Sequence, residues 1–150
     1  MNMNKSNNNN NIANIELLLR KICFKVKQKG REILEDYCIT PPQFDALQLL
    51  AIEGDMTVSE LSNRLYLAPS TITDLIDRME KNEHVIRTRD TKDRRIVKIK
   101  AMDKGKVLID EVIGRRCEYV DSLLKDVDEV DKEKFMGYLE ILNGGNFDKC

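Results

Sequence analysis

The chain has 150 residues, enough for one domain with a single core, and its 41% hydrophobic, 34% charged and 5% aromatic residues suit a helix-rich globular protein rather than a disordered one. Its formal net charge of −1 excludes a uniformly basic surface, but residues 84–100 carry seven Lys and Arg against two Asp, whereas residues 101–150 carry eight against twelve Asp and Glu. A polyanion would therefore meet one local basic patch.

The cysteines at positions 23, 38, 117 and 150 have no CxxC spacing, and no stretch has the length of a membrane span or the pattern of a secretory signal. We therefore expect a cytoplasmic protein with reduced thiols and no membrane contact. His84 is the single histidine, and we expect it to begin a strand rather than to bind zinc. Because the chain also has no Gly-rich phosphate loop and no Ser-His-Asp arrangement, the sequence predicts no enzyme, no metal and no cofactor.

The first third of the chain predicts two helices. Residues 1–11 are rich in Asn and are expected to form a disordered arm. From residue 12 to about residue 37, apolar residues recur at helical spacing with Lys and Arg between them, which predicts a long amphipathic helix whose basic side faces solvent. Pro41 and Pro42 suit the first turn of a second helix, and Gly54 ends it.

The next segment has the pattern of a helix-turn-helix. Thr57 and Glu60 form a capping box that begins a short helix to about Leu65. A turn over residues 66–68 follows, and Pro69 suits the first position of the next helix. The apolar stripe of that second helix consists of Ile72, Leu75, Ile76 and Met79.

Two strands and a turn complete this unit. Residues 85–89 and 95–100 are β-branched and roughly alternating, and they flank a polar turn at residues 90–94. A helix, a turn, a helix and a basic hairpin in this order predict a winged helix-turn-helix over about residues 40–101.

Two more helical patterns close the chain, from Asp103 to about Asp128 and from Val130 to Asn143. The predicted fold is therefore mainly α with a small β-wing, as a single domain over residues 12–150. The helices at about 12–37 and 103–143 carry more apolar surface than they can bury alone, which predicts that they are dimerisation helices of a homodimer.

Five motifs stand out along the chain: Leu61-Ser62-Asn63-Arg64-Leu65, Pro69-Ser70-Thr71-Ile72-Thr73, Leu75-Ile76-Asp77-Arg78-Met79-Glu80, Val85-x-Arg87 and Asp93-Arg94-Arg95. Together they closely resemble the MarR family of bacterial regulators, over roughly residues 12–143. The resemblance implies a transcriptional regulator that binds a pseudo-palindromic double-stranded DNA operator as a dimer, with the second helix in the major groove and the wing in the minor groove. It further implies a repressor that is released by a small ligand or by thiol oxidation.

Three positions depart from the family pattern. Glu83 stands where the family usually has the glycine that ends the recognition helix, so the left-handed residue is expected at Asn82 or is replaced. Asp103 is expected to replace the usual cap of the next helix. Asp74 occupies an exposed position of the recognition helix, where it could accept a hydrogen bond from cytosine but would weaken binding near phosphate.

The residues expected to contact DNA lie on the helix-turn-helix and on the wing. Hydroxyls at the start of a helix can donate to phosphates, and an arginine at a wing tip can enter a narrow minor groove. We expect Arg95 to read the groove and Asp93 to anchor it. The full set is Arg64, Ser70, Thr71, Thr73, Asp74, Arg78, Lys92, Asp93, Arg94 and Arg95.

The resemblance places an effector between the dimer helices and the winged part, where an apolar lining suits a small apolar or aromatic molecule. Cys23 and Cys117 are expected to be buried structural thiols, which favours a ligand over thiol-based redox sensing, the alternative. The expected lining consists of Ile15, Leu19, Ile22, Cys23, Phe44 and Leu47, with Cys117 or Tyr119.

A second alternative is a winged-helix protein-interaction module without DNA binding. The acids Asp74, Asp77 and Glu80 on the recognition helix would suit such a module. The basic residues Arg78, Arg94 and Arg95 speak against it.

Overall fold

In the computed structural model the backbone is described for residues 3–144 and the side chains for residues 10–144. The chain forms two compact units, residues 1–113 and residues 114–150, which divide within one helix. The first unit holds the helix-turn-helix and the wing, and the second holds the last turns of α5 (Asp103–Leu123) and α6 (Glu129–Leu142). Whether the two units act as the one domain expected from the sequence stays a prediction.

The first helix, α1 (Met3–Asp36), begins earlier than predicted, so the disordered arm expected over residues 1–11 is wrong from Met3 onward. Residues 3–11 contain neither Pro nor Gly. Once a helix exists, each further residue adds a backbone hydrogen bond, and Asn costs less than about 0.7 kcal/mol relative to Ala. The Asn run can therefore continue a helix that the amphipathic segment after it nucleates.

Three helices of the first unit begin and end where the sequence predicts. These are α2 (Pro41–Glu53), α3 (Val58–Leu65) and α4 (Pro69–Lys81). The Thr57 capping box is confirmed, since the Glu60 amide donates to Thr57 Oγ1 at 3.1 Å and the Thr57 amide donates to Glu60 Oε2 at 2.7 Å. Thr40 and Gln43 make a second capping box at the start of α2, and Gly54, at φ 94°, follows its end.

The wing is an antiparallel hairpin of β1 (Val85–Arg89) and β2 (Val97–Ala101), in which Val85 pairs with Ala101 and Arg89 with Val97. The second strand begins two residues later than predicted, because the Ile96 amide donates to the Asp93 carbonyl at 2.9 Å and so extends the turn. Met56 forms an isolated bridge with Ile99, which ties the hairpin to the chain before α3.

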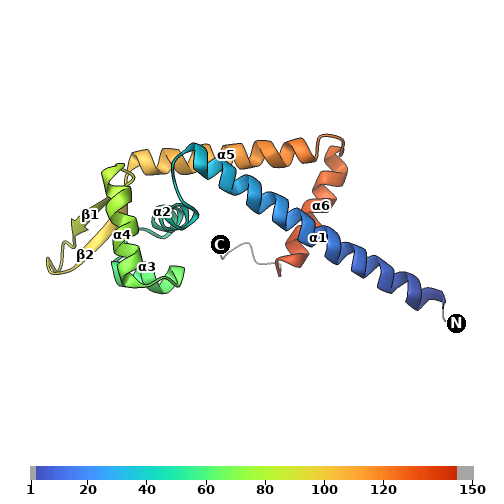
Figure 1. Cartoon of the computed structure of the whole chain (residues 1–150), viewed down its shortest axis with the longest axis horizontal. Helices are drawn as coiled ribbons and strands as arrows, with labels where there is room; N and C mark the ends of the chain where they lie inside the picture. The colour runs from blue at the N-terminus through green and yellow to red at the C-terminus, as the bar shows by residue number, and fades with distance from the viewer. Residues whose placement is uncertain (1–2, 145–150) are drawn as a thin grey trace. The chain divides into compact units, whose positions relative to one another are not determined.

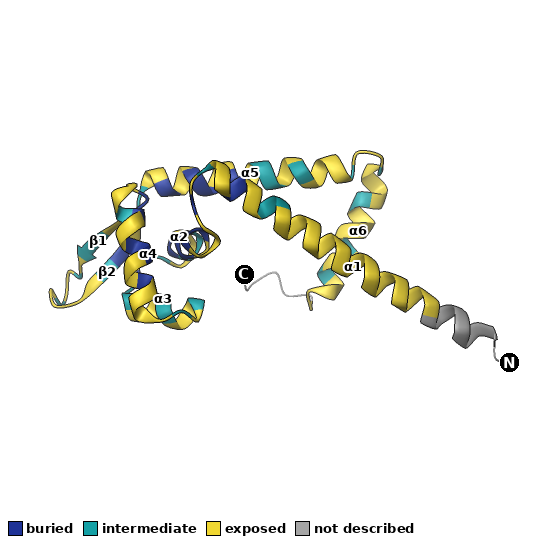
Figure 2. Ribbon diagram, in the orientation of Figure 1, coloured by how far each residue is buried: buried dark blue, intermediate teal, exposed yellow. Residues whose placement is uncertain are grey.

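The core of the first unit lies where α2, α3 and α4 meet the root of the hairpin (Figure 1). Figure 2 shows buried positions on one side of α2 and α4, and also at the end of α1 and the start of α5. The predicted apolar stripe of α4 is confirmed as part of this core. The core therefore fixes the position of α4 by its inner face and leaves its outer face to solvent. The largest fully buried side chains are Phe44, Ile33, Leu47, Leu61, Ile72, Ile76, Met79, Ile99, Val85 and Val112.

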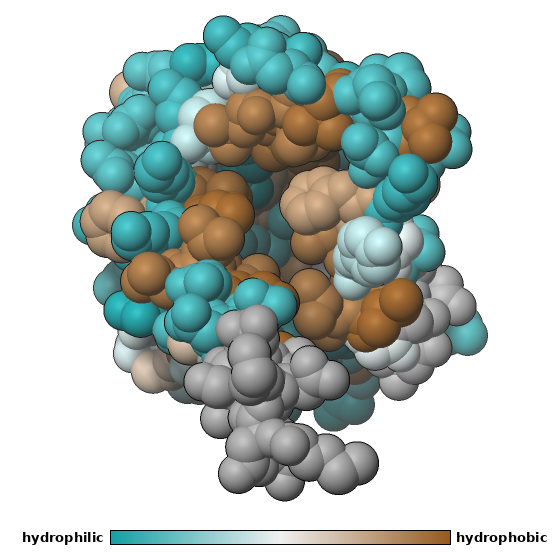
Figure 3. Space-filling model, turned by 90° about the vertical axis from the view of Figure 1, so that its right-hand side faces the viewer, coloured by the Kyte–Doolittle hydropathy of each residue, from teal (hydrophilic) through white to brown (hydrophobic). Residues whose placement is uncertain are grey.

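Apolar side chains of α1 and α6 are uncovered, each in its own unit. Figure 3 shows hydrophobic surface of this kind as brown patches. No residue of α6 is buried among those described. On α1 the exposed apolar side chains are Ile12, Ile15, Leu17, Leu18, Leu19, Ile22, Phe24 and Val26, and on α6 they are Val130, Phe135, Met136, Tyr138, Leu139, Ile141 and Leu142.

Two of the three departures from the family pattern resolve differently from expectation. Glu83 itself takes the left-handed conformation, with φ 61°, whereas Asn82 has φ −87°; placing that conformation on Asn82 was wrong. The Glu83 amide donates to the Glu80 carbonyl at 3.0 Å, so the turn closes by backbone bonds that any residue can make. Asp103 is the first residue of α5 rather than its cap, where its charge suits the helix dipole.

Gly105 marks a close approach of α5 to the rest of the first unit. A Cβ at this position would lie 2.4 Å from the His84 carbonyl oxygen and 2.8 Å from Leu47 Cδ1. The Met102 amide donates to the same His84 carbonyl at 2.9 Å. The start of α5 therefore packs directly on the backbone that joins α4 to the wing.

We predict that Gly105→Ala lowers the free energy of unfolding by about 1–3 kcal/mol, because the added methyl group overpacks backbone that cannot move aside. Gly114→Ala on the same helix is the matched control, since no atom lies within 4 Å of its Cβ position, and it should gain up to about 1 kcal/mol from helix propensity. Chemical denaturation at equal protein concentration measures both. Equal effects of the two substitutions would contradict the close approach.

Candidate nucleic-acid interface

The outer face of α4 carries most of the predicted DNA-binding residues of the helix-turn-helix. Ala68 is the N-cap residue of α4, and its side chain makes no hydrogen bond to the helix. The backbone amides in the first turn of α4 are therefore not capped by this side chain. Thr73 Oγ1 donates to the Pro69 carbonyl at 3.0 Å, which holds this hydroxyl against the start of the helix. The exposed residues of this face are Ser70, Thr71, Thr73, Asp74 and Arg78.

The acids at the other end of α4 are neutralised by one arginine of β1. Arg87 Nη2 lies 2.5 Å from Asp77 Oδ1, and Arg87 Nη1 lies 2.6 Å from Glu80 Oε2. The Arg87 amide also donates to Glu80 Oε1 at 3.0 Å. This amide, followed by the guanidinium, lowers the pKa of Glu80 below its ordinary value. Of the three acids that the sequence places on α4, only Asp74 has no ion pair among the described residues.

The sequence reasoning missed this role of Arg87, which it treated only as part of a motif. Arg87 lies two residues after Val85 on β1 and pairs with Ile99 on β2, and both of these neighbours are buried. Because side chains alternate along a strand, Arg87 lies on the same face of the hairpin as Val85, and this face is turned toward α4. The alternation from Val85 was the signal that could have found it.

Two aspartates shape the tip of the wing. Asp90 Oδ2 accepts from the amides of Lys92 and Asp93 at 3.1 and 3.2 Å, while Asp90 Oδ1 lies 3.1 Å from Lys98 Nζ. The Asp93 amide, then Lys98, hold the pKa of Asp90 below its ordinary value. Arg89 Nη1 donates to the Arg94 carbonyl at 2.9 Å and ties the two sides of the turn together.

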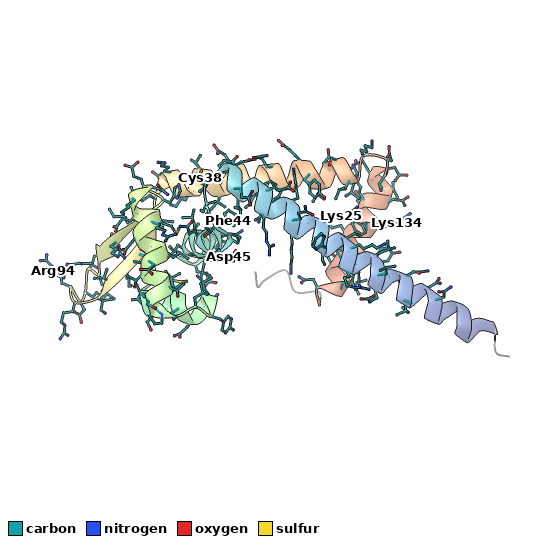
Figure 4. All side chains as sticks on the ribbon, viewed as in Figure 1. Lys25, Cys38, Phe44, Asp45, Arg94 and Lys134 are labelled. Carbon is teal, nitrogen blue, oxygen red and sulfur yellow. The ribbon has the colours of Figure 1, made fainter. Side chains whose placement is uncertain are left out.

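The three basic residues of the wing tip differ in their surroundings. The side chain of Arg95 is 91% exposed, yet its Nε and Nη2 donate to the two oxygens of Asp93 at 3.2 and 3.1 Å. This pairing lowers the pKa of Asp93. Arg94 and Lys92 form no ion pair with described side chains, and Figure 4 shows Arg94 extending from the tip of the hairpin. The wing thus presents one arginine held in a fixed direction and two free cations.

Arg64, one of the residues expected to contact DNA, lies on α3 and is paired with an acid of α2. Its guanidinium forms a two-pronged ion pair with Glu53, at the end of α2. The pair neutralises its charge and ties α3 to α2. A DNA contact of Arg64 stays a prediction, as does that of Arg78, which is exposed on α4.

The predicted effector residues are not brought together in one cavity. Phe44 and Leu47 of α2 are fully buried in the core of the first unit. The other predicted lining residues of α1, Ile15, Leu19 and Ile22, are exposed. They lie well before Ile33 and Leu34, where α1 enters the core.

The thiols are also not where the sequence placed them. Cys23 and Cys117 are both exposed, so the expectation of buried thiols is wrong for both; Cys38 is exposed too. The apolar neighbours that suggested burial of Cys23 are themselves uncovered on α1. Cys150 lies outside the described residues.

The described part of the chain offers neither a metal site nor a membrane span. Within it, no three His, Cys, Asp or Glu side chains gather as a metal site would require. Among residues 3–144, no helix has the length and apolar character that a membrane crossing needs.

Comparison with known proteins identifies the family of the chain. The MarR family model matches residues 39–97, which span α2 to the start of β2. The HTH-type transcriptional regulator YsmB of Bacillus subtilis, itself uncharacterized, is 54% identical over 114 residues, covering 76% of this chain and 78% of YsmB. The chain belongs to the MarR family.

Another curated relative and two solved structures extend the likeness over most of the chain. The HTH-type transcriptional repressor MdtR of Bacillus subtilis is 32% identical over 105 residues, covering 70% of this chain and 68% of MdtR. A MarR family protein from Bacillus stearothermophilus has 46% identity and a TM-score of 0.79, covering 91% of this chain and 96% of that one. Transcriptional regulator Tm0710 from Thermotoga maritima has 39% identity and a TM-score of 0.75, covering 92% and 99%.

Membership of the MarR family confirms the winged helix-turn-helix fold that the sequence predicts, mainly α with a two-stranded wing. It also makes the protein a DNA-binding transcriptional regulator and not an enzyme.

Proposed function

We propose that this MarR-family regulator is a cytoplasmic repressor that binds a pseudo-palindromic operator as a homodimer and is released by a small apolar or aromatic effector. The name of MdtR, a repressor, supports the sign of regulation. The observation that best supports DNA binding by this face is the ion cluster of Arg87 with Asp77 and Glu80. It neutralises Asp77 and Glu80 and joins α4 to the hairpin whose tip bears the free cations.

In this proposal α4 enters the major groove by its N-terminal end. The start of the helix offers Ser70 and Thr71 to phosphates and base edges, and the helix dipole favours an anion there. Asp74 lies one turn further along and would accept a hydrogen bond from a base amino group. Arg78 lies a further turn along the same face and would reach a phosphate.

The wing supplies contacts of two kinds. Asp93 holds Arg95 by two parallel bonds, so this arginine loses little conformational freedom when it enters a minor groove and is suited to read groove shape. Arg94 and Lys92 are free to follow the phosphates. Their contacts would add affinity for any DNA sequence.

We predict that Arg95→Ala weakens operator binding by about 1–3 kcal/mol while changing binding to unrelated DNA much less. Arg94→Ala and Lys92→Ala should each weaken binding to both DNAs and lower the slope of log affinity against log salt by about 1.8 per dimer, because each substitution removes one contact from each subunit. Titrations of the operator and of an unrelated duplex at several salt concentrations measure both effects. The DNA upstream of the protein's own gene is the first operator to try.

Asp93→Asn serves as the matched variant, because it keeps Arg95 and removes the charge that anchors it. It should reproduce part of the operator-specific loss of Arg95→Ala. If Arg95→Ala leaves affinity unchanged at matched salt, the assignment of Arg95 is wrong. If the wild type shows no sequence preference, the protein-interaction module is the better hypothesis; the pairing of Asp77 and Glu80 with Arg87 already removes most of the acidic face that would suit it.

The homodimer is supported by the apolar faces of α1 and α6. Each of these helices exposes at least seven large apolar side chains on its own unit. Such patches on a soluble regulator mark a surface that another subunit covers. A twofold dimer would also place two copies of α4 about one helical turn of DNA apart, as a pseudo-palindrome requires.

We predict that Leu139→Asp raises the dimer dissociation constant at least a hundredfold, about 3 kcal/mol over two symmetric sites. Leu139 is 45% exposed in the single chain, so the charge costs the monomer fold little. Lys125→Asp, at an exposed polar position after α5, should leave the dimer intact. Sedimentation over a range of concentrations measures this, and a wild-type monomer at micromolar concentration would refute the proposal.

The effector would act by preferring a dimer whose two α4 helices are wrongly spaced for DNA. Where the partner subunit leaves them uncovered, the apolar side chains of Ile15, Leu19 and Ile22 on α1 would offer an apolar wall for it. Phe44 and Leu47 are buried in the core and so would not touch a ligand at this wall.

A thiol switch is the second candidate for release, because Cys23 and Cys117 are exposed to oxidants. We predict that peroxide leaves operator binding unchanged in the wild type and in Cys23→Ser, as a ligand-released regulator requires. Operator titrations of both proteins with and without peroxide measure this, with Cys38→Ser as a control for oxidation elsewhere. Loss of binding in the wild type but not in Cys23→Ser would make the protein a redox sensor.

A further inference from the structure

The turn between α3 and α4 is closed without help from the side chain at its centre. The amides of Tyr66 and Leu67 both donate to the Ser62 carbonyl, the second at 3.2 Å. Ser62 Oγ donates to the Leu67 carbonyl at 2.6 Å. The turn therefore depends on backbone groups and on Ser62, and any residue that tolerates the backbone conformation could stand at position 66.

Tyr66 is an unfavourable choice for that conformation. Its φ and ψ are 55° and 38°, the left-handed region in which a Cβ crowds the backbone and which Gly and Asn tolerate best. Tyr66 is also 94% exposed, more than any other exposed large apolar residue in the described part of the chain. The fold gains nothing visible from this ring, so its use is outside the chain.

The position of Tyr66 indicates what the ring meets. It lies three residues before Pro69, beside the end of α4 that the proposed function places in the major groove. The other exposed residues of this stretch include no large apolar side chain; they are Asn63, Arg64, Ala68, Pro69 and Ser70. A ring that belongs to no apolar patch does not suit a protein interface, whereas a phenol can donate a hydrogen bond to a phosphate oxygen.

We propose that Tyr66 is a DNA-backbone contact, in which its phenolic hydroxyl donates to a phosphate next to the recognition helix. The inference rests on the proposed entry of α4 into the groove. The contact is independent of base sequence, and because the phenol is neutral it releases no counterion. Removing it should therefore weaken binding to every duplex equally and leave the salt dependence of binding unchanged.

Two substitutions in the full chain test this proposal. Tyr66→Phe removes only the hydroxyl and should lower affinity about three- to tenfold for the operator and for an unrelated duplex alike, with the same salt slope as the wild type. Tyr66→Asn removes the ring and relieves the backbone, so it should lower affinity at least as much and raise the melting temperature. Tyr138→Phe, at another exposed tyrosine on α6, is the control and should change neither quantity.

Opposite changes in affinity and stability for Tyr66→Asn would support a contact made outside the chain, because a purely structural role predicts that both fall together. Unchanged affinity of both Tyr66 variants, with a wild type that binds the operator, would overturn the inference and leave the proposed function intact. Loss of affinity in Tyr66→Asn alone would show that the hydroxyl is not the contact and would also overturn it. A wild type that binds no DNA would instead overturn the proposed function itself.

Discussion

The ion cluster of Arg87 with Asp77 and Glu80 is the interaction on which the rest of the DNA-binding unit depends. It joins β1 to α4, so the hairpin and the recognition helix hold one orientation toward each other. The contact is partly shielded, since the Arg87 side chain is only 29% exposed, and the amide of Arg87 adds a third bond. Packing of Val85 and Ile99 beneath it supplies the apolar support that an exposed ion pair lacks.

This cluster also reconciles an acidic recognition helix with a polyanionic partner. Asp77 and Glu80 would repel phosphate if they were free, and their sum would offset Arg78 and Lys81 on the same helix. Once Arg87 neutralises them, the helix keeps its two cations and one uncompensated acid, Asp74. The net charge of a chain or of a helix is thus a poor guide to the electrostatic potential at the surface that contacts DNA.

Local patterns predicted the helix-turn-helix well, because each of its boundaries has a chemical cause within a few residues. The Thr57 capping box, Pro69 and Gly54 act through bonds or backbone angles that the sequence displays. Predictions failed where the outcome depends on distant or missing partners. Cys23 was expected to be buried because its neighbours are apolar, yet it is exposed. The pairing of Arg87 with Asp77 and Glu80 was missed because these acids lie ten and seven residues away in the sequence.

The two aspartates of the wing tip have a consequence for how the protein meets acid stress. Their depressed pKa values mean that Asp90 and Asp93 stabilise the folded hairpin at every pH above their ordinary value of 3.8, and that this stability is lost only as the pH falls through their still lower folded values. A fall in pH to about 5–6, the range in which histidine titrates, stays well above that range. The hairpin is therefore insulated from changes in proton concentration that a turn closed by histidine would register.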